Sequence, residues 1–200
     1  MTMTIRRALD TGATEPVSLS EAKAHCRVDT GDDDALILGL ITAARQLCEF
    51  ATHVSLMPTV CTMTLDAFPD NGLIELWHGP VNSVTWVKYL DSAGVQQTLA
   101  GASYRTDLQS NPGRIALAPN ASWPSTEAGA IAAVSVSYKT GYGGAGPALP
   151  QAVKQWILLH VAHYYANREP AVALTVGTPA ISPLPVLDGL LDDVRVWPLG

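Results

Sequence analysis

Four aspartates gather between residues 29 and 34, and carboxylate oxygens in such a cluster are the ligands that calcium prefers. The four are Asp29, Asp32, Asp33 and Asp34. A calcium loop also requires the D-x-[DN]-x-[DN]-G spacing and a bidentate Glu, and the run has neither. Carboxylates at a helix start complement the helix dipole. We therefore expect these aspartates to open a helix or to face a basic neighbour, and we predict no metal.

Two histidines, His160 and His163, lie three residues apart in a segment with helical character. This spacing could place two metal ligands beside each other on one helix face. No carboxylate stands at a matching position, and Glu169 lies beyond the expected helix end. We therefore expect a pair of core or interface histidines.

The glycine-rich run 141–146 resembles a phosphate-binding loop in composition only. It lacks the Lys-Ser/Thr pair of a P-loop, and Pro147 follows where a strand-to-helix turn would be required. A flexible hinge is the simpler interpretation. The chain also has no G-x-S-x-G nucleophile elbow, and its Ser, His and Asp residues are scattered. No enzymatic activity and no cofactor are predicted.

The composition is that of a soluble, intracellular structural protein with little charge. Of the 200 residues, 48% are hydrophobic and 15% are charged, and the net charge is -6. This is sufficient for a core but gives no basic surface for nucleic acid. Three cysteines, Cys26, Cys48 and Cys61, form no even set and no C-x-x-C pair, which indicates reduced thiols. We expect no signal peptide and no membrane segment, because no stretch approaches the roughly 20 apolar residues that span a bilayer.

Three helices are expected to position these residues. The sequence Ser18-Leu19-Ser20-Glu21 has the form of a capping box and predicts a helix over about 19–27. A second helix, near 33–52, has apolar residues at the helical period. Its stripe consists of Ile37, Leu40, Ile41, Ala44, Leu47 and Ala51. A third helix, over 151–167, is apolar on several sides, which indicates burial in its own domain or in a neighbour.

Between the second and third helices the hydrophobic period changes to two, which is typical of strands. The expected strands are 59–65, 73–77, 81–90, 95–99, 103–107, 114–118 and 131–138. Short strands with tight turns predict a small antiparallel sandwich or a barrel-like sheet. The predicted fold class is α+β, with an α-helical frame, a small antiparallel β-rich insert and an extended C-terminal tail. The frame consists of the two N-terminal helices and the late long helix.

The predicted division has three parts. Residues 1–54 together with 147–170 form the helical core, and residues 55–146 form the β-rich insert. Residues 171–200 form an extended, proline-rich tail, in which 186–196 could be a short helix.

Four local sequences, in this order, resemble the head-tail connector (adaptor) proteins of long-tailed phages and gene transfer agents. They are LSEAKAHCRVD (19–29), DDDALILGLITAAR (32–45), GPVNSVTWVKYLD (79–91) and LPQAVKQWILLHVAHYYANRE (149–169). The resemblance implies a structural subunit of a homo-oligomeric ring, usually of twelve copies, between the portal and the stopper or tail-completion proteins. It implies DNA passage through the lumen without sequence-specific binding, assembly at the head-tail junction of the virion, and synthesis in the host bacterial cytoplasm. It implies no reaction and no cofactor.

Six residues are expected to lie at the contacts with other subunits or partners. They are Arg45, Trp156, His160, Tyr164, Arg168 and Trp197. Large aromatic side chains suit protein interfaces, while the two arginines could equally form salt bridges within the chain. The resemblance also implies that 171–200 reaches into the portal. Two other functions stay open: a small-molecule-binding or catalytic α+β domain, and a β-module that binds tail fibres or sugars.

Overall fold

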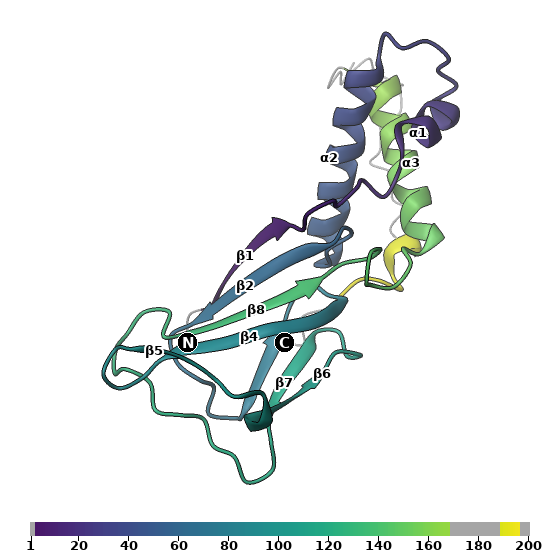
Figure 1. Cartoon of the computed structure of the whole chain (residues 1–200). Helices are drawn as coiled ribbons and strands as arrows, with labels where there is room; N and C mark the ends of the chain where they lie inside the picture. Colours follow the sequence, from purple (N-terminus) through teal and green to yellow (C-terminus); the bar gives the residue numbers. More distant parts are fainter. Residues whose placement is uncertain (1–2, 169–188, 197–200) are drawn as a thin grey trace, which may run out of the picture. The chain divides into compact units, whose positions relative to one another are not determined.

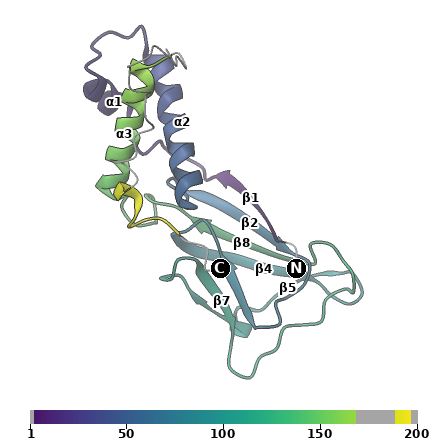
Figure 2. The ribbon, with the colours of Figure 1, turned by 180° about the vertical axis from the view of Figure 1, so that it is seen from behind.

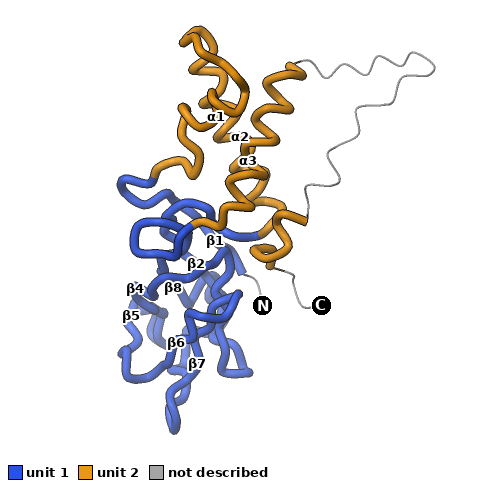
Figure 3. Tube along the Cα trace, turned by 90° about the vertical axis from the view of Figure 1, so that its right-hand side faces the viewer, with its two compact units in different colours: residues 1–13, 53–148 blue, residues 14–52, 149–200 orange. Residues whose placement is uncertain are grey.

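The computed structural model describes residues 3–168 and 189–196 of the chain (Figure 1). The chain separates into two units, each built from two stretches of sequence (Figure 3). Residues 1–13 and 53–148 form the first, here the sheet unit, and residues 14–52 and 149–200 form the second, the helical unit. The described residues confirm the prediction of a mixed α and β protein with three helices and antiparallel sheets.

Two antiparallel sheets make up the sheet unit. The larger has the order β1-β2-β8-β4-β5, and its face is seen from behind in Figure 2. Its strands are β1 (Met3–Leu9), β2 (Thr59–Leu65), β8 (Val134–Thr140), β4 (Val81–Leu90) and β5 (Gln96–Thr98). The smaller sheet has the order β3-β7-β6, with β3 (Leu73–Leu76), β7 (Gly113–Leu117) and β6 (Tyr104–Asp107). A 3-10 turn, Gly101–Ser103, precedes β6.

Alternation of buried and half-buried residues along β2 shows why this segment is a strand. Its buried side chains join one hydrophobic cluster with side chains from both sheets, which packs the sheets face to face as a sandwich. The cluster consists of Cys61, Met63, Leu65, Phe68, Ile74, Leu76, Val81, Val87, Leu99, Ile115, Val134, Val136 and Tyr138. The Tyr138 hydroxyl, deep in this core, donates a hydrogen bond to the carbonyl of Trp77 at 3.0 Å.

Strand β1 lies in the sheet unit, although the predicted division placed residues 1–54 with the helices. It pairs with β2 along its whole length, from Met3 opposite Leu65 to Leu9 opposite Thr59. The N-terminal segment therefore completes the large sheet as an edge strand, and the helical unit begins at Thr14. Backbone hydrogen bonds to a distant strand decide this placement, because β1 is exposed over nearly all its residues and has little hydrophobic signal.

The glycine run 141–146 is an ordered turn rather than the flexible hinge that its composition predicted. The Asn82 side-chain amide donates a hydrogen bond to the carbonyl of Gly141 at 2.9 Å. The backbone N–H of Gly143 donates to the carbonyl of Pro147 at 2.8 Å. Several of these glycines have positive φ, which explains their abundance without any need for flexibility.

The helical unit contains α1 (Leu19–Cys26), α2 (Asp34–Thr52) and α3 (Gln151–Ala166). Helix α1 begins with the predicted capping box. The Ser18 hydroxyl accepts a hydrogen bond from the backbone N–H of Glu21 at 3.2 Å, and the Glu21 carboxylate accepts one from the backbone N–H of Ser18 at 2.8 Å. Two otherwise unpaired amide groups are thereby satisfied at the helix start.

Replacing Ser18 with alanine is expected to lower the free energy of unfolding by about 1 kcal/mol, because one reciprocal cap is lost. Urea denaturation followed by circular dichroism at 222 nm measures this change. Ser18→Thr keeps the hydroxyl and serves as the matched control. Equal stability of Ser18→Ala and the parent chain would contradict the role of the capping box.

Residues 189–196 form a short turn in the helical unit. Its first residues form a 3-10 turn, and the side chains of Leu191, Val194 and Val196 are buried. The backbone N–H of Val196 donates a hydrogen bond to the carbonyl of Thr52, at the end of α2. This part of the predicted extended tail is therefore packed, because its apolar side chains find a core.

Candidate interaction surfaces

An aromatic stripe follows one side of α3, where residues four positions apart lie above one another. The rings of Trp156 and His160 stack with their centroids 3.6 Å apart. Tyr164 meets His160 edge to face at 6.1 Å. Trp156 is buried at 3% exposure, whereas His160 and Tyr164 are half-buried. The structure thus brings together three of the predicted interface residues, and His160 and Tyr164 keep part of their side chains accessible.

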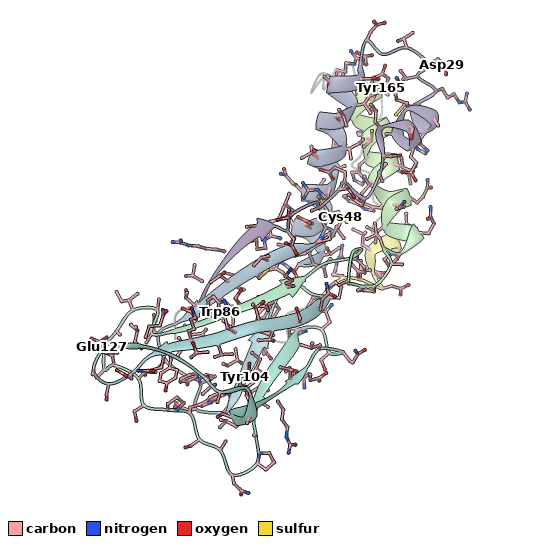
Figure 4. The ribbon with its side chains drawn as sticks, in the orientation of Figure 1. Asp29, Cys48, Trp86, Tyr104, Glu127 and Tyr165 are labelled. Atoms are coloured by element: carbon pink, nitrogen blue, oxygen red, sulfur yellow. The ribbon has the colours of Figure 1, made fainter. Side chains whose placement is uncertain are left out.

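Asp33, before the start of α2, is held by two residues at the end of α3. Its carboxylate accepts hydrogen bonds from the Tyr165 hydroxyl at 2.5 Å and from the Arg168 guanidinium at 2.8 Å. The Arg168 guanidinium also lies over the Tyr165 ring at 4.7 Å. The hydrogen bonds from Tyr165 and then Arg168 hold the pKa of Asp33 below its usual value. Figure 4 labels Tyr165 at this end of α3.

Arg168 therefore has a partner within its own unit, although half of its side chain stays exposed. The acidic run is also paired at Asp34, whose carboxylate lies 2.6 Å from the Lys23 ammonium. In these two contacts the aspartates face basic neighbours, Arg168 and Lys23, which was one of the two expectations for the acidic run. No group of three or more His, Cys, Asp or Glu within residues 3–168 and 189–196 could hold a metal ion.

Arg45 is buried in the interior of the helical unit. Its Nε lies 2.8 Å from the Glu15 carboxylate, and its Nη1 lies 3.2 Å from the Glu49 carboxylate. Only 6% of Arg45 is exposed. Thr42 donates its hydroxyl hydrogen to the same Glu15 carboxylate at 2.9 Å. The structure therefore places Arg45 in an internal network, while Trp197 lies outside the described residues.

The outward side of α2 is a surface that sequence analysis did not identify. Ile37, Ile41 and Ala44 of the predicted stripe are fully buried, but Leu47 is 40% exposed. Phe50 is 77% exposed. The sequence does contain a signal for this surface, because α2 is apolar on more than one side. A helix that packs through a single core stripe does not require this.

By length and composition, α2 is also the described helix that could cross a membrane, a segment that sequence analysis did not expect. Core helices of soluble proteins meet the same criterion. Here one side of α2 forms the core of the helical unit, and the ion network of Arg45 lies on that side.

Two loop tips of the sheet unit expose apolar side chains. Val95, beside the β4–β5 turn, is 54% exposed, and Ile131, before β8, is 87% exposed. The backbone N–H of Glu127 donates a hydrogen bond to the carbonyl of Leu90, which ties the two loops together. Each loop tip therefore presents one exposed apolar side chain on the sheet unit.

His78 is a half-buried titratable group of the sheet unit. Its Nδ1 has no hydrogen-bond partner within the described residues. Burial, followed by the positive charges of Arg7 and His53, lowers the pKa of His78 to about 4. The folded protein thus favours the neutral imidazole, while the unfolded chain binds a proton near the ordinary value of 6.5.

Stability of the sheet unit is expected to fall as the pH decreases from about 6.5 to about 4, because the unfolded state gains the His78 proton first. His78→Asn should flatten this part of the profile, since asparagine tolerates the positive φ of 64° at this position without titrating. Urea denaturation at a series of pH values measures it. His25→Asn, in the helical unit, is the control. An unchanged profile in His78→Asn would contradict the assignment.

The described surfaces consist of stacked aromatics, paired charges and exposed apolar side chains on a mixed α and β subunit. Together with the following matches, these features support a structural connector. Residues 16–86 match the family of phage gp6-like head-tail connector proteins. No curated protein matches the chain.

Three solved structures resemble the chain over nearly its whole length. The neck of an empty GTA particle computed with C6 symmetry has a TM-score of 0.73, 25% identity, and coverage of 100% of this chain and 98% of that chain. The virion of a native gene transfer agent (GTA) particle has a TM-score of 0.71 with the same identity and coverage. The neck of a native GTA particle computed with C12 symmetry has a TM-score of 0.69, 25% identity, and 98% coverage of both chains. The resemblance to head-tail connectors predicted from the sequence is confirmed.

Proposed function

We propose that this chain is a subunit of a homo-oligomeric ring at the head-tail junction of a phage or gene transfer agent particle. The ring lies between the portal and the stopper or tail-completion proteins, and DNA passes through it. The observation that carries the proposal is the match of nearly the whole chain to neck chains, at a TM-score of 0.73 with 98% of the other chain covered. The family match at 16–86 supports the same function independently.

The sixfold and twelvefold symmetries of the two neck structures support a ring, and twelve copies are proposed. Each subunit of a ring needs two different faces that join its two neighbours. A net charge of -6 agrees with a lumen through which DNA slides without being held. The chain acts as a structural protein in the virion, made in the host bacterial cytoplasm, with no enzymatic step.

The two exposed surfaces receive different partners under this proposal. The loop tips at Val95 and Ile131 face the stopper or tail-completion protein, because their apolar side chains are exposed on the sheet unit. His160 and Tyr164 on α3, and Arg168 just after it, lie at contacts of the helical unit, since each keeps part of its side chain accessible. The proline-rich segment that begins at residue 171 reaches the portal.

Assembly with the portal tests the proposed function. Purified chain mixed with its portal should give a complex with a ring of subunits, seen by electron microscopy and by mass photometry. The chain without portal is the control, since a template can be required before subunits close a ring. A chain that never joins portal complexes at any ratio would overturn the proposal.

Two truncations test the role of the C-terminal segment. A chain that ends at Val196 keeps the buried side chains of the 189–196 turn, whereas a chain that ends at Arg168 loses both the turn and the proline-rich segment. A third chain, with 171–186 replaced by a Gly/Ser linker of equal length, keeps the turn and removes the prolines. Circular dichroism should show that this third chain folds. It should no longer attach to the portal. Attachment at full strength would contradict the assignment of this segment.

A further inference from the structure

Helix α2 has a second apolar stripe on the side away from its core. Leu36, Leu40, Ala43, Leu47 and Phe50 follow one another at spacings of four, three, four and three residues. Alternating spacings of three and four residues are typical of the side chains that pack between two helices in a coiled coil. Leu36 is 38% exposed, Leu47 40% and Phe50 77%. Along the helix axis the stripe extends over roughly 21 Å.

Charge is missing from this stripe. The ten residues from Ala35 to Ala44 include no Asp, Glu, Lys or Arg. The first charged side chain after them, Arg45, pairs with Glu15 and Glu49 on the buried side. Solvent-facing helix surfaces normally have charged or polar side chains, so an uncharged outward stripe indicates a surface that another protein covers.

Gly39 supplies an independent observation on the same side of α2. A glycine inside a helix costs about 1 kcal/mol relative to alanine. Nothing within 4 Å would meet a Cβ at Gly39, so the packing of this chain does not require a glycine there. Together with Ala43, one turn later, Gly39 leaves the α2 backbone open to close approach by another helix.

The three-and-four spacing of the stripe fits a helix as its occupant. The segment 169–188 of this chain is a poor source, because prolines 170, 179, 183 and 185 interrupt it. Helix α3 offers a matching surface, in which Gln155, Leu159, Ala162 and Ala166 follow one another at spacings of four, three and four residues. None of these four is charged, and none is fully buried.

We propose that the α2 stripe packs against this surface of α3 in a second copy of the chain. The proposal rests on the proposed ring, for which it names the contact between neighbouring subunits. An α2-to-α3 contact is heterologous and can continue around a ring, whereas an α2-to-α2 contact would close a dimer and stop. The small residues Ala43 and Ala162 lie near the middle of the two stripes and allow the helices to approach.

Cross-linking between singly substituted copies tests the contact. One protein has Ala43→Cys and the other Ala162→Cys, both with Cys26→Ser so that the partly exposed native thiol is removed. The two, distinguished by a mass tag, are mixed with portal and treated with a short bismaleimide. A cross-linked product with one copy of each is expected. A product between two Ala43→Cys copies, or no product between copies in a formed ring, would overturn the contact but leave the proposed function intact.

Charge substitutions give a second readout. Leu47→Glu with Phe50→Glu places two carboxylates in the seam and should lower the yield of rings at least about tenfold. The helical unit should keep its circular dichroism, because both side chains are exposed in the single chain. Leu9→Glu, on the exposed edge strand β1 of the sheet unit, is the matched control and should assemble normally. Normal assembly of the double variant would overturn the inference, and failure of the unmodified chain to form rings with portal would overturn the proposed function.

Discussion

Arg45→Met is expected to lower the free energy of unfolding of the helical unit by about 3 to 5 kcal/mol. The substitution keeps an unbranched, flexible side chain but removes the guanidinium and its charge between two carboxylates. Glu49 would then be left as a carboxylate in the interior, with only 10% of its side chain exposed and its Arg45 partner gone. Urea denaturation followed by circular dichroism at 222 nm measures the loss, since this signal comes mainly from the helices.

The control for Arg45 removes both members of the pair. In Arg45→Met the Glu49 carboxylate faces an apolar side chain, and the added substitution Glu49→Met removes that carboxylate. Part of the lost stability should therefore return, although the Glu15 carboxylate stays. A coupling energy near zero between the two positions would show that the ion pair at 3.2 Å does not stabilise the unit. Glu15→Gln, whose carboxylate is 26% exposed, should cost less than either single change.

Gly141→Ala is expected to destabilise the sheet unit by about 3 kcal/mol. The φ of Gly141 is +105°, a conformation that residues with a side chain rarely adopt. A Cβ built there would lie 2.0 Å from the Met57 carbonyl oxygen, and backbone cannot move aside as a flexible side chain can. Thermal unfolding followed by the fluorescence of tryptophans in the sheet unit measures the change.

Gly101→Ala is the matched control for Gly141, because it lies in the same unit. Gly101 has no positive φ, and nothing lies within 4 Å of an added Cβ. Its stability should stay within about 0.5 kcal/mol of the parent chain. Similar losses in both variants would contradict the steric explanation and point to a general effect of losing glycine.

Ring assembly should respond differently to Arg45→Met and to changes in the α2 stripe. Arg45→Met acts on the helical unit through its interior, so both folding and ring formation are expected to weaken. Leu47→Glu with Phe50→Glu acts on an exposed surface and should weaken ring formation alone. The comparison separates loss of fold from loss of contact.

Local signals in the sequence were sufficient for most of the elements. The capping box at Ser18 correctly predicted the start of α1, because its hydrogen bonds join residues only three positions apart. The alternation along 59–65 predicted β2, and the turn signals on either side of 81–90 predicted β4, both with their observed bounds. The order of local motifs also led to the connector family, since each motif is contiguous in the chain.

Only the tertiary structure decided which surfaces each element meets. Strand β1 joins the sheet through backbone pairs with β2, about 55 residues away, and backbone groups have no sequence signature. The turn at Gly141 is held by a hydrogen bond from the Asn82 side chain, and its glycine is required because a Cβ there would meet the Met57 carbonyl oxygen. Composition reveals neither contact. Leu47 is as apolar as Ile41, yet Leu47 is exposed and Ile41 is buried. The side of α2 that a residue occupies decides its burial only after α3 has packed against one side. Hydrophobic periodicity therefore predicted that α2 is a helix, while packing determined which of its apolar residues remain available to a partner.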